Sequence, residues 1–250
     1  MPLANPAGHN APTDRLTSRY DAAARRWHGK IARLRYLDAY AAIARTARER
    51  IAPARPGAPL RVLDAGAGTG AFSLAFAATR AEPLALDLLD LSEAMLAVAR
   101  ENVEQAGLNC RTIVGALGER PLEGRAYDVV LCSHLIEHVP DPTAALADLC
   151  AALRPGGALL LVVSKPHWCT ALLRLVWGHR ALADAEVAAR LAAAGLADHA
   201  RCPFALGPPS RTSMGHLARL RSPTRGGAFS GVARGARGGA GARLLEHQPT

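Results

Sequence analysis

The 250-residue sequence predicts an α/β fold in which helices cover both faces of a doubly wound, mostly parallel sheet. Short apolar runs alternate with segments of helical periodicity along the middle of the chain, which is typical of repeated strand and helix units. Two of these runs end in an acid, Asp64 and Asp90, directly before a turn or a helix. The last two extended segments, 198–206 and 212–220, flank a Gly-Pro-Pro-Ser turn, so we expect the final strand to be antiparallel.

Composition and charge exclude several classes of protein. Half of the residues are hydrophobic, and the longest apolar run, Ala158 to Val163, is too short to cross a bilayer. The five cysteines form no C-x-x-C pair, which predicts neither a disulfide framework nor a metal site. The net charge of +9 lies in the flanks, because residues 56–220 carry nearly equal numbers of basic and acidic side chains. We therefore expect a cytoplasmic protein that binds no nucleic acid.

Glycine, proline and apolar residues divide the chain into four segments. We expect residues 1–13 to be disordered and residues 14–55 to form a helical cap, which Gly29 divides into two helices. Prolines then separate this cap from a globular domain over residues 56–220. Residues 221–250 are rich in Gly, Ala and Arg, which predicts a disordered tail.

Two aromatic segments allow more than one interpretation. The helical cap is either a lid, with Tyr20 and Trp27 facing a ligand, or a surface helix packed on the sheet edge. The insert after the fifth strand contains His167 and Trp168, which could line a pocket for a flat apolar ligand or pack on the domain. An amphipathic face in this insert would also permit peripheral contact with a membrane.

A glycine-rich turn follows the first predicted strand. Gly66, Gly68 and Gly70 are spaced one residue apart after Asp64, and a helical segment follows. Glycines suit a turn whose backbone needs positive φ and must approach a ligand closely. The dinucleotide fingerprint is G-x-G-x-x-G, and an acid beside it would repel a pyrophosphate. The turn, including Ala67, therefore predicts a site for a ligand with an ammonium group.

A second acid and a histidine-rich segment lie at later strand ends. Asp90 ends the second strand, where a carboxylate can accept two hydrogen bonds from ribose hydroxyls; Asp87 is the alternative. The fourth strand, 127–133, is followed by His134, Glu137 and His138. Because strand ends surround the ligand crevice, these three residues are candidates for proton transfer.

Four segments in this order resemble the class I S-adenosylmethionine (SAM) dependent methyltransferases: Val62 to Gly70, Asp90 to Leu96, the Glu-His-Val stretch at 137–139, and the Arg-Pro-Gly-Gly turn at 154–157. The third segment is similar to the small-molecule methyltransferases of the ubiquinone and menaquinone type, a methyltransferase type 11-like family. The resemblance implies a Rossmann-like, seven-stranded sheet and SAM as the cofactor.

The resemblance also assigns the cofactor site. Asp64 and the glycine turn would hold the methionine end of SAM, Asp90 the ribose, and Leu91, Ala116 and Leu117 the adenine, with Ser133 as a further cofactor contact. The family usually has an acid at the position of Ala116. The backbone of Ala116 and Leu117, or the side chain of Glu119, would have to replace it.

We expect methyl transfer to an oxygen, nitrogen or carbon atom of a small-molecule acceptor, which could be quinone-like or a lipid. His138 would be the base and Glu137 would orient it, with His134 as a second candidate; the stretch could equally be structural, because methyl transfer often needs only alignment of the reactants. The alternatives are a non-catalytic SAM-fold binding or regulatory protein and, with less support, a nicotinamide-dependent oxidoreductase. The acceptor and the oligomeric state do not follow from the sequence.

Overall fold

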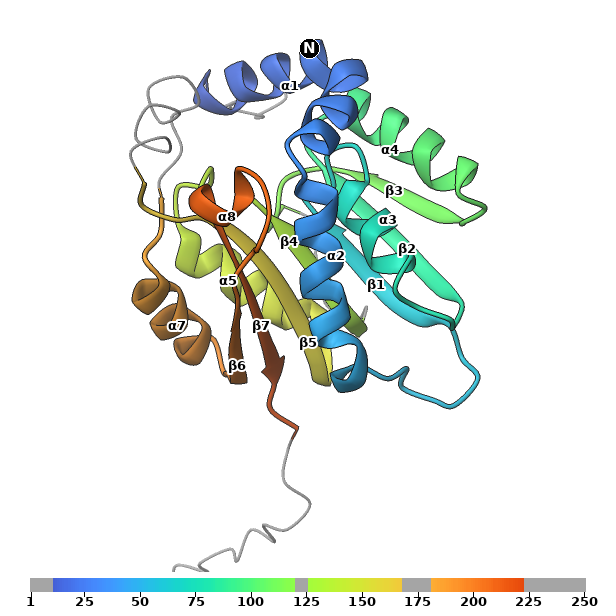
Figure 1. Ribbon diagram of the computed structural model, residues 1–250, viewed down its shortest axis with the longest axis vertical. Helices are drawn as coiled ribbons and strands as arrows, with labels where there is room; N and C mark the ends of the chain where they lie inside the picture. Colours follow the sequence, from blue (N-terminus) through green and yellow to red (C-terminus); the bar gives the residue numbers. More distant parts are fainter. Residues whose placement is uncertain (1–10, 120–125, 168–180, 223–250) are drawn as a thin grey trace, which may run out of the picture.

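Seven strands form one sheet in the order β3-β2-β1-β4-β5-β7-β6, with helices on both of its faces (Figure 1). The computed structural model describes residues 11–119, 126–167 and 181–222. The strands are β1 (Leu60–Ala65), β2 (Leu84–Asp90), β3 (Cys110–Val114), β4 (Tyr127–Ser133), β5 (Leu153–Ser164), β6 (Leu196–Cys202) and β7 (Ser213–Leu220). The first five pair in parallel, and β7 is antiparallel to both β5 and β6. The predicted doubly wound fold with an antiparallel last strand is confirmed.

Helices α1, α2 and η1 precede the first strand, and the other helices connect the strands of the sheet (Figure 1). Their bounds are α1 (Ala11–Arg33), α2 (Tyr36–Ala47), the short 3-10 helix η1 (Arg48–Arg50), α3 (Ala71–Ala77), α4 (Glu93–Gln105), α5 (Pro142–Ala152), α7 (Asp184–Ala193) and α8 (Pro209–Thr212). The strand order reverses between β1 and β4. In doubly wound sheets, ligands bind outside the carboxyl ends of the strands at such a point.

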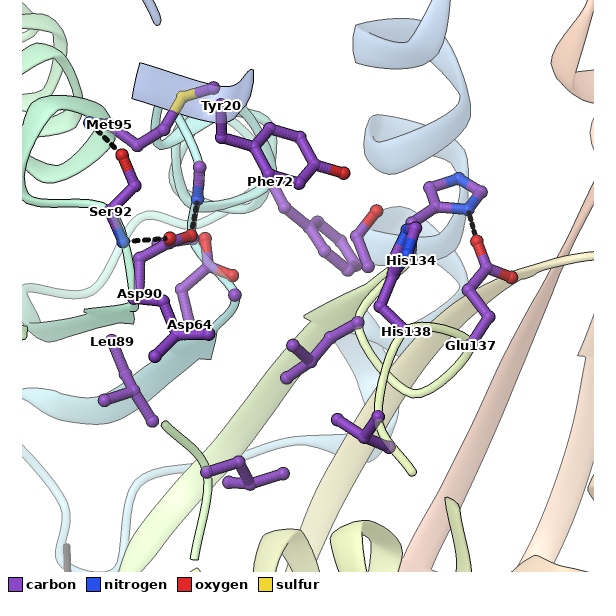
Figure 2. Close-up of a pocket in the computed structure, with 18 of the residues that line it drawn as sticks. Tyr20, Asp64, Phe72, Leu89, Asp90, Ser92, Met95, His134, Glu137 and His138 are labelled. Atoms are coloured by element: carbon purple, nitrogen blue, oxygen red, sulfur yellow. Dashed lines mark hydrogen bonds and ion pairs between the residues drawn. The ribbon is translucent and has the colours of Figure 1, made fainter. Parts of the chain in front are cut away.

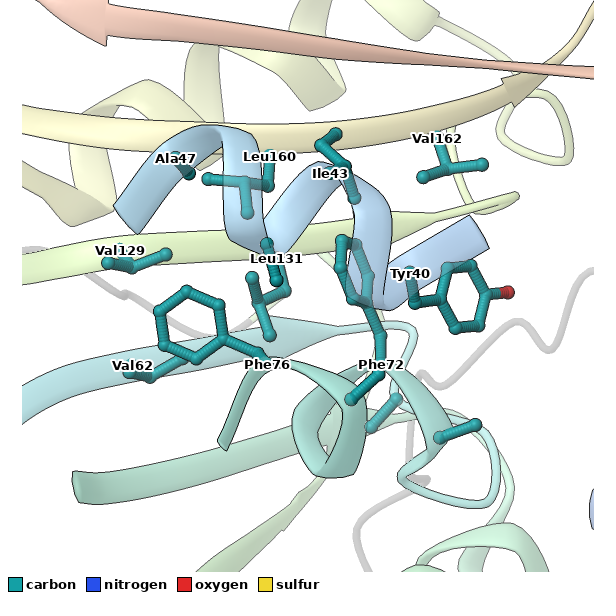
Figure 3. Packing of buried hydrophobic residues seen from close by; sticks show 14 of the residues in the cluster. Tyr40, Ile43, Ala47, Val62, Phe72, Phe76, Val129, Leu131, Leu160 and Val162 are labelled. Carbon is teal, nitrogen blue, oxygen red and sulfur yellow. The ribbon is translucent and has the colours of Figure 1, made fainter. Parts of the chain in front are cut away.

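Two hydrophobic layers hold the helices on the sheet. On one face, Ile43 of α2 and Phe76 of α3 are fully buried with Leu131 of β4, and Figure 3 shows α2 and α3 packed side by side over these strands. On the other face, Leu146 of α5 and Val187 of α7 are fully buried. The strands are apolar on both faces because both faces are covered, which explains why β4 reads as a continuous apolar run.

Local signals in the sequence place several helix ends correctly. The Ser92 hydroxyl accepts a hydrogen bond from the Met95 N–H at 3.0 Å and caps α4. The Asp141 carboxylate caps α5 by accepting from the N–H of Thr143 at 2.8 Å, and Pro142 is the first helical residue. A side chain that accepts these otherwise unpaired N–H groups stabilises a helix start by roughly 1 kcal/mol.

The break in the helical cap differs from the sequence prediction. Gly29 lies within α1, and the chain instead turns at Arg35, whose φ is 65°. A side chain on Gly207 would approach within 3.1 Å of the Arg35 Cβ, so Gly207 leaves space for this turn. Glycine inside a helix costs only about 1 kcal/mol, which tertiary packing offsets.

Two turns near the end of the sheet also differ in detail. The Arg-Pro-Gly-Gly stretch belongs to β5, which starts at Leu153; the pairing shifts between Tyr127 and Val129 of β4 and accommodates the additional residues. The expected hairpin contains α8 between β6 and β7, with Pro209 at its start. The predicted disordered start overlaps α1, which begins at Ala11; residues 1–10, Trp168 and the tail from 223 onward lie outside the described residues.

Candidate functional site

A cavity of about 690 Å³ lies at the carboxyl ends of the parallel strands. Figure 2 shows Tyr20, Asp90 and the two histidines around it. Of the residues selected from the sequence, the cavity is lined by Tyr20, Trp27, Asp64, Gly66, Ala67, Gly68, Asp90, Leu91, Ala116, Leu117, Ser133, His134, Glu137 and His138. The fold thus brings five separate segments of the chain to one space.

The glycine turn after β1 holds Asp64 in a buried position. Gly66, Gly68 and Gly70 have φ values of 71°, 52° and 76°, which side chains rarely adopt. The Asp64 Oδ2 accepts hydrogen bonds from Ser73, from its Oγ at 2.7 Å and its N–H at 3.2 Å. Its Oδ1 has no hydrogen-bond partner among the described residues. Burial raises the pKa of this carboxyl to about 7, because it disfavours the charged form. A cationic ligand beside Asp64 would stabilise the ionised carboxylate.

Asp90 closes the turn from the neighbouring strand. Its Oδ2 accepts from the N–H of Gly68 at 2.8 Å and its Oδ1 from the N–H of Ser92 at 2.9 Å (Figure 2). Burial raises the pKa of Asp90, and these N–H groups oppose that increase. Asp87 faces elsewhere, because its carboxylate pairs with Arg111 and accepts from the Tyr127 hydroxyl. Of the two acids, only Asp90 lines the cavity.

The wall after β3 has no acidic side chain at position 116. The Ala116 N–H donates to the Glu119 carboxylate at 3.1 Å, so Glu119 holds the turn and does not line the cavity. Helix α5 contributes Ala144, Ala145 and Asp148 to the lining of the same cavity. The sequence analysis missed Asp148, because the sequence of a helix does not show which distant loop each of its side chains faces.

Helix α1 covers the cavity and is hydrogen-bonded to the loops that follow β1 and β2. The Asp21 carboxylate accepts from the Ser92 hydroxyl, and His28 Nδ1 lies 3.3 Å from the Thr69 Oγ1. Tyr20 and Trp27 contact each other edge to face, with ring centroids 5.6 Å apart, and both line the cavity. The two aromatic residues that were selected from the sequence of the helical cap therefore line the cavity.

The Glu137 carboxylate lies on the opposite side of the cavity and contacts His134. Its Oε1 is 2.7 Å from the His134 Nδ1, and its Oε2 accepts from the N–H of Ser164 at 2.7 Å. The His134 Nδ1 also lies 3.3 Å from the Ser164 Oγ of β5, and φ at His134 is 55°. Backbone in this region is strained for residues other than glycine and is concentrated at functional sites. His134 Nε2 is buried with no hydrogen-bond partner among the described residues. The expected pairing of Glu137 with His138 stays a prediction.

Aromatic residues of α2 surround this histidine, a contribution that the sequence analysis also missed. The Tyr36 ring lies 5.5 Å from the His134 ring, edge to face. Tyr40 stacks on Phe72 at 4.7 Å, and its hydroxyl is 2.7 Å from the Ser133 Oγ. The wall beside His134 is therefore formed largely by aromatic rings.

The insert after β5 was expected to contribute to the same wall. Trp168 lies outside the described residues, and His167 is not among the described residues that line the cavity. The chain leaves β5 toward α8, where the Lys165 N–H donates to the Thr212 carbonyl at 2.9 Å.

Two further features of the described residues concern membrane association and metal binding. No helix within them has the length and apolar character needed to span a membrane. Within the same residues, no group of three or more His, Cys, Asp or Glu side chains is arranged to hold a metal ion.

The fold and the site together define a class of protein. The strand order with its antiparallel last pair, the glycine turn after β1 and the acid at the end of β2 are those of the class I SAM-dependent methyltransferases. Residues 62–157 match the family of methyltransferase domains. The matched residues make up less than half of the chain, and this part of it is similar to methyltransferase domains.

Curated relatives match the same part of the chain. A ubiquinone biosynthesis O-methyltransferase of Xanthomonas campestris is 37% identical over 112 residues, which are 43% of this chain and 44% of that protein. A ubiquinone/menaquinone biosynthesis C-methyltransferase of Shewanella piezotolerans is 32% identical over 118 residues, 46% of each protein. The match thus spans less than half the length of these relatives.

A solved structure extends the likeness in fold to nearly the whole chain. The 1,6-didemethyltoxoflavin-N1-methyltransferase of Burkholderia thailandensis, determined with 1,6-didemethyltoxoflavin and S-adenosylhomocysteine bound, has a TM-score of 0.62. The match covers 89% of this chain and 93% of that one at 22% identity. At this identity the comparison shows a common fold.

Proposed function

We propose that this chain transfers a methyl group from SAM to a planar small-molecule acceptor that carries an acidic O–H or N–H group. The observation that carries the proposal is one cavity with two different ends. One end has the buried carboxylate of Asp64 beside the glycine turn, with one oxygen unpaired. The other end has the buried Glu137 in contact with the partly buried His134. The first suits the cofactor and the second suits proton transfer from an acceptor.

The residues of the first end fit SAM. The unpaired Oδ1 of Asp64 would accept from the ammonium group of the methionine part, and the N–H groups of the glycine turn would contact its carboxylate. Asp90 has lone pairs left on both oxygens after its two N–H contacts, so it would accept from the ribose hydroxyls. When bound there, SAM supplies an electrophilic methyl group on a sulfonium ion.

The second end fits an acceptor that must lose a proton. The Glu137 carboxylate favours the proton of a neutral His134 on Nδ1, which leaves Nε2 as an acceptor. His134 would take the acceptor's proton, and Glu137 would stabilise the imidazolium that forms. The aromatic rings of Tyr20, Trp27 and Tyr36 line the cavity and favour a flat, apolar acceptor. A phenol, an enol or a ring N–H has these properties, and two relatives are named as methyltransferases of quinone biosynthesis.

Cofactor binding tests the first half of this proposal. We expect Asp90→Ala to bind S-adenosylhomocysteine at least about tenfold more weakly than the wild type, because a charged hydrogen-bond acceptor for the ribose contributes roughly 1.5–3 kcal/mol. The measurement is a calorimetric titration of the purified chain. Asp87→Ala is the matched control, since Asp87 is an acid of the same strand that pairs with Arg111 outside the cavity.

Three outcomes would contradict the proposal. Absence of binding by the wild type would remove the enzyme hypothesis, and preferential binding of a nicotinamide cofactor would favour an oxidoreductase. Binding without any methyl transfer to a panel of phenols, hydroxyquinones and ring N–H compounds, assayed with methyl-labelled SAM, would favour a non-catalytic binding protein.

A further inference from the structure

The adenine end of the proposed cofactor site contains a carboxylate with no assigned role. Asp148 of α5 lines the same cavity as Gly115, Ala116 and Leu117. A Cβ added to Gly118 would lie 2.8 Å from the Asp148 Oδ2, so this carboxylate lies directly against the loop that follows β3. Gly118 has a φ of +87°, and its lack of a side chain leaves room for that approach.

Asp148 differs from the other two carboxylates at this end. Glu119 accepts from the Ala116 N–H and does not line the cavity. Asp141 caps α5 through hydrogen bonds from Thr143 and Ala144. Asp148 makes neither a hydrogen bond nor an ion pair with any residue of the described ranges. It is therefore the acid that remains available to a ligand here.

We propose that Asp148 recognises the exocyclic amino group of adenine and replaces the acid that is missing at position 116. This inference rests on the proposed function, since it concerns the same cofactor. A carboxylate accepts a hydrogen bond from the 6-amino group. It repels the 6-oxo group of hypoxanthine, because both are acceptors. Asp148 is thus a specificity-determining residue that selects adenine and is supplied by α5 instead of the loop after β3.

The test compares S-adenosylhomocysteine with S-inosylhomocysteine. The two ligands differ at position 6 of the purine ring, where the first has an amino group and the second an oxo group. We expect the wild type to bind the adenosyl compound at least about tenfold more tightly, because a site built for a hydrogen bond rejects an analogue that cannot make it. In Asp148→Ala this preference should fall at least about fivefold, through weaker binding of the adenosyl compound. Asp148→Asn should also reduce the preference for the adenosyl compound, because a carboxamide can donate a hydrogen bond to the 6-oxo group of the inosyl compound.

The control is Glu119→Ala, which removes the neighbouring carboxylate and should keep the wild-type preference. Thermal unfolding of each variant shows whether it is folded; if Asp148→Ala is not, Asp148→Asn gives the result. An unchanged preference in folded Asp148 variants, or an equal loss for both ligands, would overturn the inference while leaving the proposed function standing. Failure of the wild type to bind either compound would instead overturn the proposed function.

Discussion

Replacing His134 by alanine is expected to lower kcat by about 100- to 10,000-fold, the usual contribution of a positioned base. The effect on S-adenosylhomocysteine affinity should be small, because His134 lies at the acceptor end of the cavity. Glu137→Gln should lower kcat less, since the amide still contacts the ring but no longer stabilises the imidazolium. The measurement is steady-state kinetics with an acceptor found by screening phenols and hydroxyquinones.

Two further measurements separate a base from a structural residue. Imidazole added to His134→Ala should restore part of the activity, and the rise of kcat with pH that a histidine base causes should disappear in this variant. His199→Ala is the control, because His199 lies on the edge strand β6 and is not among the lining residues. If His138→Ala loses activity to the same extent and His134→Ala does not, then His138 is the base.

The second large effect concerns Asp64 and the pH dependence of stability. Its pKa is about 7 in the folded protein and 3.8 ordinarily, so the folded state binds an additional proton between these values. The contribution of this group to stability is therefore fully present below about pH 4 and is lost as the pH rises to about 7. Between about pH 4 and pH 7, the contribution of Asp64 to the free energy of unfolding changes by about 4 kcal/mol. Urea unfolding of the wild type and Asp64→Asn at several pH values would measure it.

Cofactor binding should show the opposite trend. An ammonium group beside Asp64 favours the ionised carboxylate, so affinity for S-adenosylhomocysteine should increase as the pH rises toward 7, by up to about tenfold per pH unit. Asp64→Asn should bind more weakly and lose this part of the pH dependence. Asp90 also has a raised pKa, which is why the variant must be compared with the wild type over the same pH range. Equal slopes for both proteins would exclude contact between Asp64 and the ammonium group.

The sequence by itself determined the fold and the cofactor-side elements. The strand Tyr127–Ser133 has the predicted bounds, and Ser92 and Asp141 cap α4 and α5. These features depend on neighbours within a few residues, through the alternation of apolar runs and the hydrogen bonds of caps and turns. The same locality explains why the glycine turn and the acid at the end of β2 could be found.

The tertiary structure decided the partners of the polar side chains. The sequence suggested His138 as the partner of Glu137. In the structure, the N–H of Ser164, which lies 27 residues away on β5, donates to the Glu137 Oε2. The Glu137 Oε1 contacts His134. Asp148 faces the loop after β3 only because α5 packs on the sheet beside it. Which strand or loop a side chain meets is set by long-range packing, and one chain's local pattern does not contain that information.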